Sequence, residues 1–140
     1  MDKMVSLHKY YLWATYMAAS WQREIAKIEK PTSWAHPEAL HAFMFMSYWF
    51  ATLYVVVEGW QELGLSDPAV DVLLTEPHLA LLKRYRHGVF HFQADYFDKR
   101  YRDSTDQGET GSAWVNNLHG AFTAYFTRWM ATHNLDGTHK

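Results

Sequence analysis

The chain of 140 residues contains no cysteine, and it has only four prolines and seven glycines. The absence of cysteine excludes disulfides and thiolate metal sites. It also favours a reducing compartment, so we expect a cytoplasmic protein. The formal net charge is −2, which gives no overall basic surface. Any contact with nucleic acid therefore has to come from a local basic patch.

Several sequence signatures of function are absent as well. We find no serine or cysteine nucleophile motif, no glycine-rich phosphate loop, no internal repeat and no strand pattern. The first residues carry polar side chains within their apolar pattern and lack a small-residue cleavage site, so we expect no signal peptide. The length fits a single domain spanning residues 1–140, long enough for one hydrophobic core.

The longest uncharged segment, AFMFMSYWFATLYVVV, spans residues 42–57. It is shorter than the roughly 20 apolar residues that a bilayer span needs, and no basic cluster flanks it. We therefore expect no membrane association and a helix that is buried on nearly every side. Burial on every side is hard to achieve within so small a domain. The segment thus indicates a second subunit, and we expect a homodimer.

Apolar residues recur with the period of a helix through most of the chain. One stripe predicts a long helix that Pro31 ends, and its members are Met4, Leu7, Tyr11, Ala14, Ala18, Trp21, Ile25 and Ile28. A second helix is expected from Pro37 to about Leu63, with Gly64 as its C-terminal cap. Asp67 and Pro68 predict the start of a short helix through Leu74.

The second half of the chain predicts two further helices. One begins near Pro77 and continues to about Gln93, or as far as Tyr101, with Leu79, Leu82, Val89 and Phe90 on its inner side. Residues 103–111 form a polar loop, and Ser112 caps a last helix with a stripe of Val115, Leu118, Phe122, Tyr125 and Trp129. We therefore predict an all-α fold of four main helices and one short helix, arranged as an antiparallel up-down bundle.

The helix around residues 81–93, LLKRYRHGVFHFQ, carries the residues best suited to chemistry. Arg86 lies four residues after Leu82 and three before Val89, so it falls on the apolar stripe. Its guanidinium must therefore be paired, or line a cavity or an interface. Gly88 costs about 1 kcal/mol relative to alanine within a helix, and such a glycine often marks a close approach. On an ideal helix, His91 lies about 140° around and roughly 7.5 Å along the axis from Arg86.

The segment Arg86-His87-Gly88-Val89-Phe90-His91 resembles the Arg-x(4–6)-His motif of the HEPN superfamily of helical ribonucleases, in which a polar residue commonly follows the arginine. The resemblance implies metal-independent RNA cleavage without a cofactor, at a site formed by two facing subunits. It assigns catalysis to Arg86 and His91. Arg84 and His87 are then candidates for RNA contacts. Members of the superfamily act as toxins of toxin–antitoxin pairs and in phage defence, so an antitoxin protein is a further expected partner.

These residue types suit the cleavage of RNA by its own 2′-hydroxyl group. A histidine can exchange protons near neutral pH, and an arginine can hold phosphate oxygens through two parallel hydrogen bonds. Arg84 also fits the longest spacing of the motif, so the choice between Arg84 and Arg86 stays open. Glu58 is one candidate for an acidic partner. Two interpretations stay open for five basic residues, namely Lys83, Arg84, Lys99, Arg100 and Arg102. They could form a local patch that steers phosphates, or a solvated helix face, since Asp95, Asp98 and Asp103 lie among them.

Two alternatives remain. The first is a catalytically silent helical module for dimerisation or partner binding, in which Arg86 pairs with Glu58 or Glu62 and His91 bonds a backbone carbonyl. The second is a metal site, because His87 and His91 have a spacing that can hold zinc. Its third ligand would have to be one of four histidines: His36, His41, His119 or His133. No spacing recommends any of them, so we expect no metal.

Overall fold

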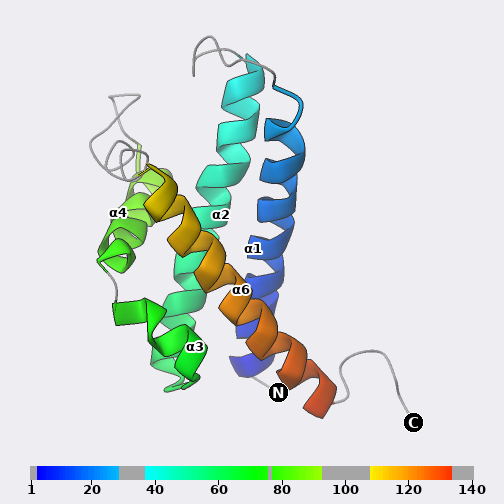
Figure 1. Ribbon diagram of the computed structural model, residues 1–140, viewed down its shortest axis with the longest axis vertical. Coiled ribbons are helices and arrows are strands. Elements are labelled where there is room, and N and C mark those ends of the chain that lie inside the picture. Colours follow the sequence, from blue (N-terminus) through cyan, green and yellow to red (C-terminus); the bar gives the residue numbers. More distant parts are fainter. Residues whose placement is uncertain (1–2, 29–36, 76, 93–107, 134–140) are drawn as a thin grey trace.

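The computed structural model describes residues 3–28, 37–75, 77–92 and 108–133, and within these ranges helices are joined by turns, with no strand. Helices α1 (Lys3–Ile25) and α2 (Pro37–Glu62) lie side by side and run in opposite directions (Figure 1). Helix α6 (Gly108–Thr132) crosses this pair obliquely, and α4 (His78–Phe90) packs against α2. Along the chain, the short α3 (Pro68–Asp71) and a 3₁₀ turn (Leu73–Thr75) connect α2 to α4. The prediction of an all-α chain is confirmed.

The predicted apolar stripes form the core. Leu7, Tyr11 and Ala14 of α1 are buried, and Leu118 and Phe122 of α6 are fully buried. The outer members of both stripes pack partly buried against this cluster, namely Met4, Ala18, Trp21, Tyr125 and Trp129. The helical period of apolar residues in the sequence therefore located the inner faces of both helices, because the apolar stripe of each helix is buried when the helices pack.

Helix α2 departs from the prediction that it is buried on nearly every side. Leu40, Met44 and Tyr48 lie at successive turns and are 37%, 42% and 43% exposed, whereas Trp49, Leu53 and Val57 are buried. Among the described residues, α2 is the one helix with the length and apolar composition to cross a bilayer, and 44% of its most apolar window is buried within the protein. The uncharged segment thus combines a core face with an exposed apolar face.

Two of the three predicted caps are confirmed. Gly64 has a φ of +64°, a conformation that favours glycine, and its N–H donates to the Gln61 carbonyl while the Leu65 N–H donates to that of Trp60. Asp67 accepts hydrogen bonds from the backbone N–H groups of Ala69 and Val70 at 3.0 and 3.3 Å. These caps hold the turn that leads from α2 back towards α4.

Several predicted boundaries were wrong. Helix α1 ends at Ile25, and the short helix ends at Asp71 and gives way to the 3₁₀ turn. Helix α6 begins at Gly108 instead of after Ser112, because adding a residue to an established helix forms one more hydrogen bond at small cost. Helix α4 ends at Phe90, which is 56% exposed and not on the inner side. The turn at Pro31 and the expected extension of α4 from residue 93 to Tyr101 lie outside the described residues.

Candidate active site

The inner face of α4 is formed by residues at intervals of three. Leu82 and Tyr85 are 3% and 0% exposed, and Gly88 is buried. The Tyr85 ring meets Phe50 of α2 edge-on at 5.2 Å, and its hydroxyl lies 3.2 Å from the Ser47 hydroxyl. Tyr85 therefore fixes the rotation of α4 against α2, and this rotation determines where the neighbouring Arg86 lies. Gly88 is buried, and the close approach expected there stays a prediction.

Arg86 lies at the edge of this inner face and is paired within the chain. Its Nη1 atom is 2.8 Å from Oε1 of Glu58 on α2, and its guanidinium carbon is 5.7 Å from the centre of the Tyr54 ring. The Arg86 and Glu58 side chains are 39% and 41% exposed. Of the two carboxylates that the sequence left open for this arginine, the structure brings Glu58 to it. The Arg86 side chain is thus partly exposed, while the Glu58 Oε1 atom that it meets is buried.

The two histidines of the motif lie at the end of α4. His91 has left the helix, with φ −123° and ψ 135°, so the separation from Arg86 expected on an ideal helix does not hold. The rings of His87 and His91 are 4.2 Å apart between centres, and both residues are exposed. Two imidazoles therefore stand together on the surface, directly after the residue that pairs with Glu58.

The remaining predicted RNA contacts are placed only in part. Arg84 and Lys83 are exposed on α4. Arg84 precedes Arg86 by two residues, which is about 200° on a helix, so the two guanidinium groups leave α4 in different directions. Lys99, Arg100 and Arg102 lie outside the described residues. The structure thus pairs Arg86 with Glu58 of α2.

His119, one of the candidate metal ligands, is instead held in a hydrogen-bond chain. The Trp49 indole N–H donates to Nδ1 of His119 at 2.9 Å, so that nitrogen carries no proton. The other ring nitrogen, Nε2, lies 3.0 Å from the Thr15 hydroxyl, which donates to the Tyr11 carbonyl. Nε2–H is therefore the donor to Thr15. Burial lowers the pKa of His119, which agrees with a neutral ring in this position.

The other candidate ligands have partners of their own or lie outside the described residues. His41 is exposed with Nδ1 3.5 Å from a Glu24 oxygen, and His133 contacts the Trp129 carbonyl. His36 lies outside the described ranges. Within those ranges, no three histidine, aspartate or glutamate residues are grouped as a metal site requires. The histidine spacing in the sequence could not reveal the partners of His41 and His119, because these contacts join residues of different helices.

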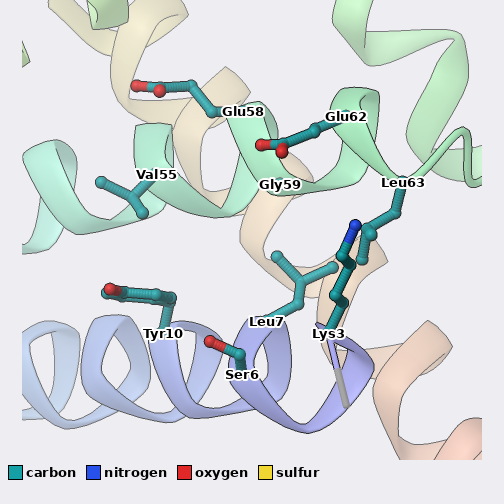
Figure 2. Close-up of a pocket in the computed structure, with 9 residues that line it drawn as sticks. All are labelled: Lys3, Ser6, Leu7, Tyr10, Val55, Glu58, Gly59, Glu62 and Leu63. Carbon is teal, nitrogen blue, oxygen red and sulfur yellow. The ribbon is translucent and has the colours of Figure 1, made fainter.

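A cavity beside the Glu58–Arg86 pair was not predicted from the sequence. It has a volume of about 260 Å³ and lies between α1 and α2 (Figure 2). Its walls come from nine residues: Lys3, Ser6, Leu7, Tyr10, Val55, Glu58, Gly59, Glu62 and Leu63. The signal in the sequence was the pair of acids, Glu58 and Glu62, one turn apart and flanking a glycine at the end of an apolar helix. Glu58 belongs to both the cavity and the ion pair.

Comparisons of the chain with models of protein families, with curated proteins and with solved structures find no match.

Proposed function

We propose that the chain is a metal-independent endoribonuclease of the HEPN type, built on an antiparallel up-down helical bundle. The observation that carries the proposal is the exposure of both motif residues. Arg86 is half-exposed beside Glu58, and His91 stands exposed next to His87 at the end of the same helix. A packing role for the motif would instead enclose the cation and the ring, because an exposed pair contributes little stability.

In the proposed reaction, the attacking group is the 2′-hydroxyl of the RNA itself. His91 takes the proton of the 2′-hydroxyl, whose oxygen then bonds to the phosphorus. The bond from phosphorus to the 5′ oxygen breaks, which leaves a 2′,3′-cyclic phosphate, and the departing 5′ oxygen takes up a proton from the protonated histidine. Arg86 stabilises the charge that develops on the phosphate. Glu58 contacts the guanidinium at Nη1, so it orients Arg86 and compensates its charge until phosphate binds. His87 and Arg84 contact the RNA around the cleaved bond. The proposed reaction uses no cofactor. We place the activity in the cytoplasm, as part of a toxin–antitoxin system or of phage defence. In a toxin–antitoxin system, the partner is an antitoxin protein.

The proposed site is completed by a second copy of the chain. Leu40, Met44 and Tyr48 of α2 and Phe90 of α4 form an exposed apolar face, which we call the α2–α4 face. The Tyr48 and Phe90 rings are in contact, with centres 6.1 Å apart. Adjoining exposed apolar side chains of this kind mark interaction surfaces. Phe90 directly precedes His91, so a homodimer through this face brings two copies of the motif together.

The central experiment incubates single-stranded RNA with the pure protein in EDTA. We expect cleavage by the wild-type chain and a loss of about 100-fold or more in His91→Ala and Arg86→Ala. The matched controls are His133→Ala and Arg23→Ala, which remove an exposed histidine and an exposed arginine from other helices or their ends. Arg84→Ala decides between the two arginines. Cleavage that EDTA abolishes would favour the metal alternative.

The second candidate function is a catalytically silent module for dimerisation or partner binding. The Glu58–Arg86 pair favours it, since it gives the arginine a partner within the chain, and so does the α2–α4 face. Intact RNA in every lane would establish this alternative over the nuclease. Analytical ultracentrifugation tests for the homodimer independently of RNA cleavage. We expect Met44→Glu to dissociate the dimer, while Val72→Glu, at an exposed apolar residue of the α3 turn, leaves it intact.

A further inference from the structure

The cavity between α1 and α2 has the size of a single heterocyclic ring system. Its volume of about 260 Å³ far exceeds the roughly 30 Å³ share of one water molecule and lies below the range of drug-sized pockets, which begins at about 300 Å³. Its floor is formed where Leu7 packs onto Gly59. A Cβ atom at Gly59 would come within 2.5 Å of Leu7 Cδ1, so the glycine permits this close approach of α1 to α2.

The polar groups around the cavity are arranged on opposite sides. Glu58 and Glu62 stand on the α2 side, while Ser6, Tyr10 and Lys3 extend from α1, with the Tyr10 ring at one end and Lys3 at the other (Figure 2). Arg86 already balances the charge of Glu58. This leaves one carboxylate, Glu62, and one ammonium group, Lys3. The lining residues together with Arg86 therefore carry no net charge, while the Lys9 ammonium lies 4.7 Å from the centre of the Tyr10 ring. Such surroundings suit a neutral ligand with both donors and acceptors.

A carboxylate offers two acceptor oxygens side by side, so it selects a ligand with two parallel N–H donors. Among the four RNA bases, only guanine presents such a pair on its Watson–Crick edge, as N1–H and N2–H, and its O6 acceptor lies beside them. Adenine and cytosine present one amino group, and uracil presents one ring N–H. The Lys3 ammonium can donate to O6, and an aromatic ring such as Tyr10 can stack on the base, as in other single-stranded RNA sites.

We propose that this cavity binds a guanine base of the RNA, with Glu62 accepting from N1–H and N2–H, Lys3 donating to O6 and Tyr10 stacking on the ring. The inference rests on the proposed ribonuclease function, and it names the sequence preference of that site. Glu58 links the two regions because it lines the cavity and contacts Arg86 at 2.8 Å. A guanine in the cavity thus lies one side chain away from the cation that holds the phosphate.

An arginine side chain of a protein partner also presents two parallel N–H donors to a carboxylate. It would, however, bring a further positive charge into a cavity that Lys3 already lines and whose other carboxylate is paired with Arg86. The neutral base avoids this repulsion, so the charges favour RNA. The experiment therefore includes arginine as a competitor.

Binding is measured by calorimetry with guanosine, inosine, adenosine and L-argininamide, without any need for cleavage. Inosine lacks the N2 amino group and therefore one of the two donors. We expect guanosine to bind about tenfold or more tightly than inosine and adenosine, the discrimination typical of a bidentate base contact. Glu62→Gln should remove this preference. Glu38→Gln, an exposed acid in the first turn of α2 and outside the cavity, should keep it.

The outcomes separate this proposal from the ribonuclease. Guanosine binding that depends on Glu62, together with intact RNA, would keep the guanine site and remove the nuclease. Cleavage of RNA without preference for guanine, and without guanosine binding, would overturn the guanine site alone. Tighter binding of L-argininamide than of guanosine would assign the cavity to a basic side chain of a protein partner and refute the proposal. Because Glu62 is exposed, its substitution leaves the core intact, and circular dichroism verifies the fold of each variant.

Discussion

The ion pair between Arg86 and Glu58 offers the sharpest test of what the arginine does. Its atoms are 2.8 Å apart, but the two side chains are 39% and 41% exposed. The Glu58 Oε1 atom at the contact is itself buried, but water reaches the rest of both side chains and screens their attraction. Ion pairs between exposed side chains contribute about 0.2–1 kcal/mol to stability. Breaking a buried pair costs about 3–5 kcal/mol instead, because a charge is left without a partner. An arginine kept at the surface to hold phosphate and an arginine kept as half of a buried structural pair thus predict coupling energies that differ by several kcal/mol.

The measurement is a double-mutant cycle by urea unfolding of the wild type, Arg86→Ala, Glu58→Ala and the double variant. We expect a coupling energy of about 1 kcal/mol or less. RNA cleavage by the same four proteins should fall by about 100-fold when Arg86 is absent, and far less in Glu58→Ala, which keeps the guanidinium. Arg128→Ala is the control, since it removes an exposed arginine that also contacts a carboxylate, that of Asp67, at 2.8 Å.

A coupling energy of about 3 kcal/mol or more would refute this reasoning, because only a desolvated structural pair reaches that size. The same conclusion would follow if Arg86→Ala lost activity only in proportion to its unfolded fraction. Arg86 would then hold α4 against α2, and the silent helical module would become the better account of the chain.

Two further predictions concern stability. Burial lowers the pKa of His119 below 6.5, so the unfolded chain binds a proton that the folded chain does not. Stability is therefore greatest above about pH 6.5 and falls as the pH drops below it. Burial also lowers the pKa of His8, so this histidine contributes a pH dependence of the same sign. In urea unfolding, the free energy of unfolding of His119→Gln should therefore depend on pH less steeply than that of the wild type, but it should still depend on pH. An unchanged slope would contradict the neutral His119. Asp67→Ala should lower the free energy of unfolding by about 1 kcal/mol through loss of the cap to α3, whereas Asp67→Asn, which keeps an acceptor oxygen, should lose less. Equal losses in a denaturation experiment would assign the effect to the contact with Arg128 instead.

The sequence predicted helices and their inner faces well, and it predicted ends and exposure less well. The stripes from Leu7 to Ala14 and from Val115 to Phe122 became core because their period is a local property of the chain. Phe90 was placed on the inner side from its apolar character, yet the rotation set by Tyr85 leaves it 56% exposed. The exposed apolar residues of α2 were missed for the same reason. An apolar run does not state which of its sides another helix covers.

The amino-acid sequence by itself determined the helical class, the caps at Gly64 and Asp67, and the chemistry that residues 86–91 can perform, because each depends on neighbours within a few turns of one helix. Only the tertiary structure decided that Glu58 pairs with Arg86, that Trp49 and Thr15 hold His119 between them, and that a cavity opens between α1 and α2 beside Glu62. Each of these contacts joins separate helices. Their partners are selected by how the helices pack against one another, which no local pattern encodes.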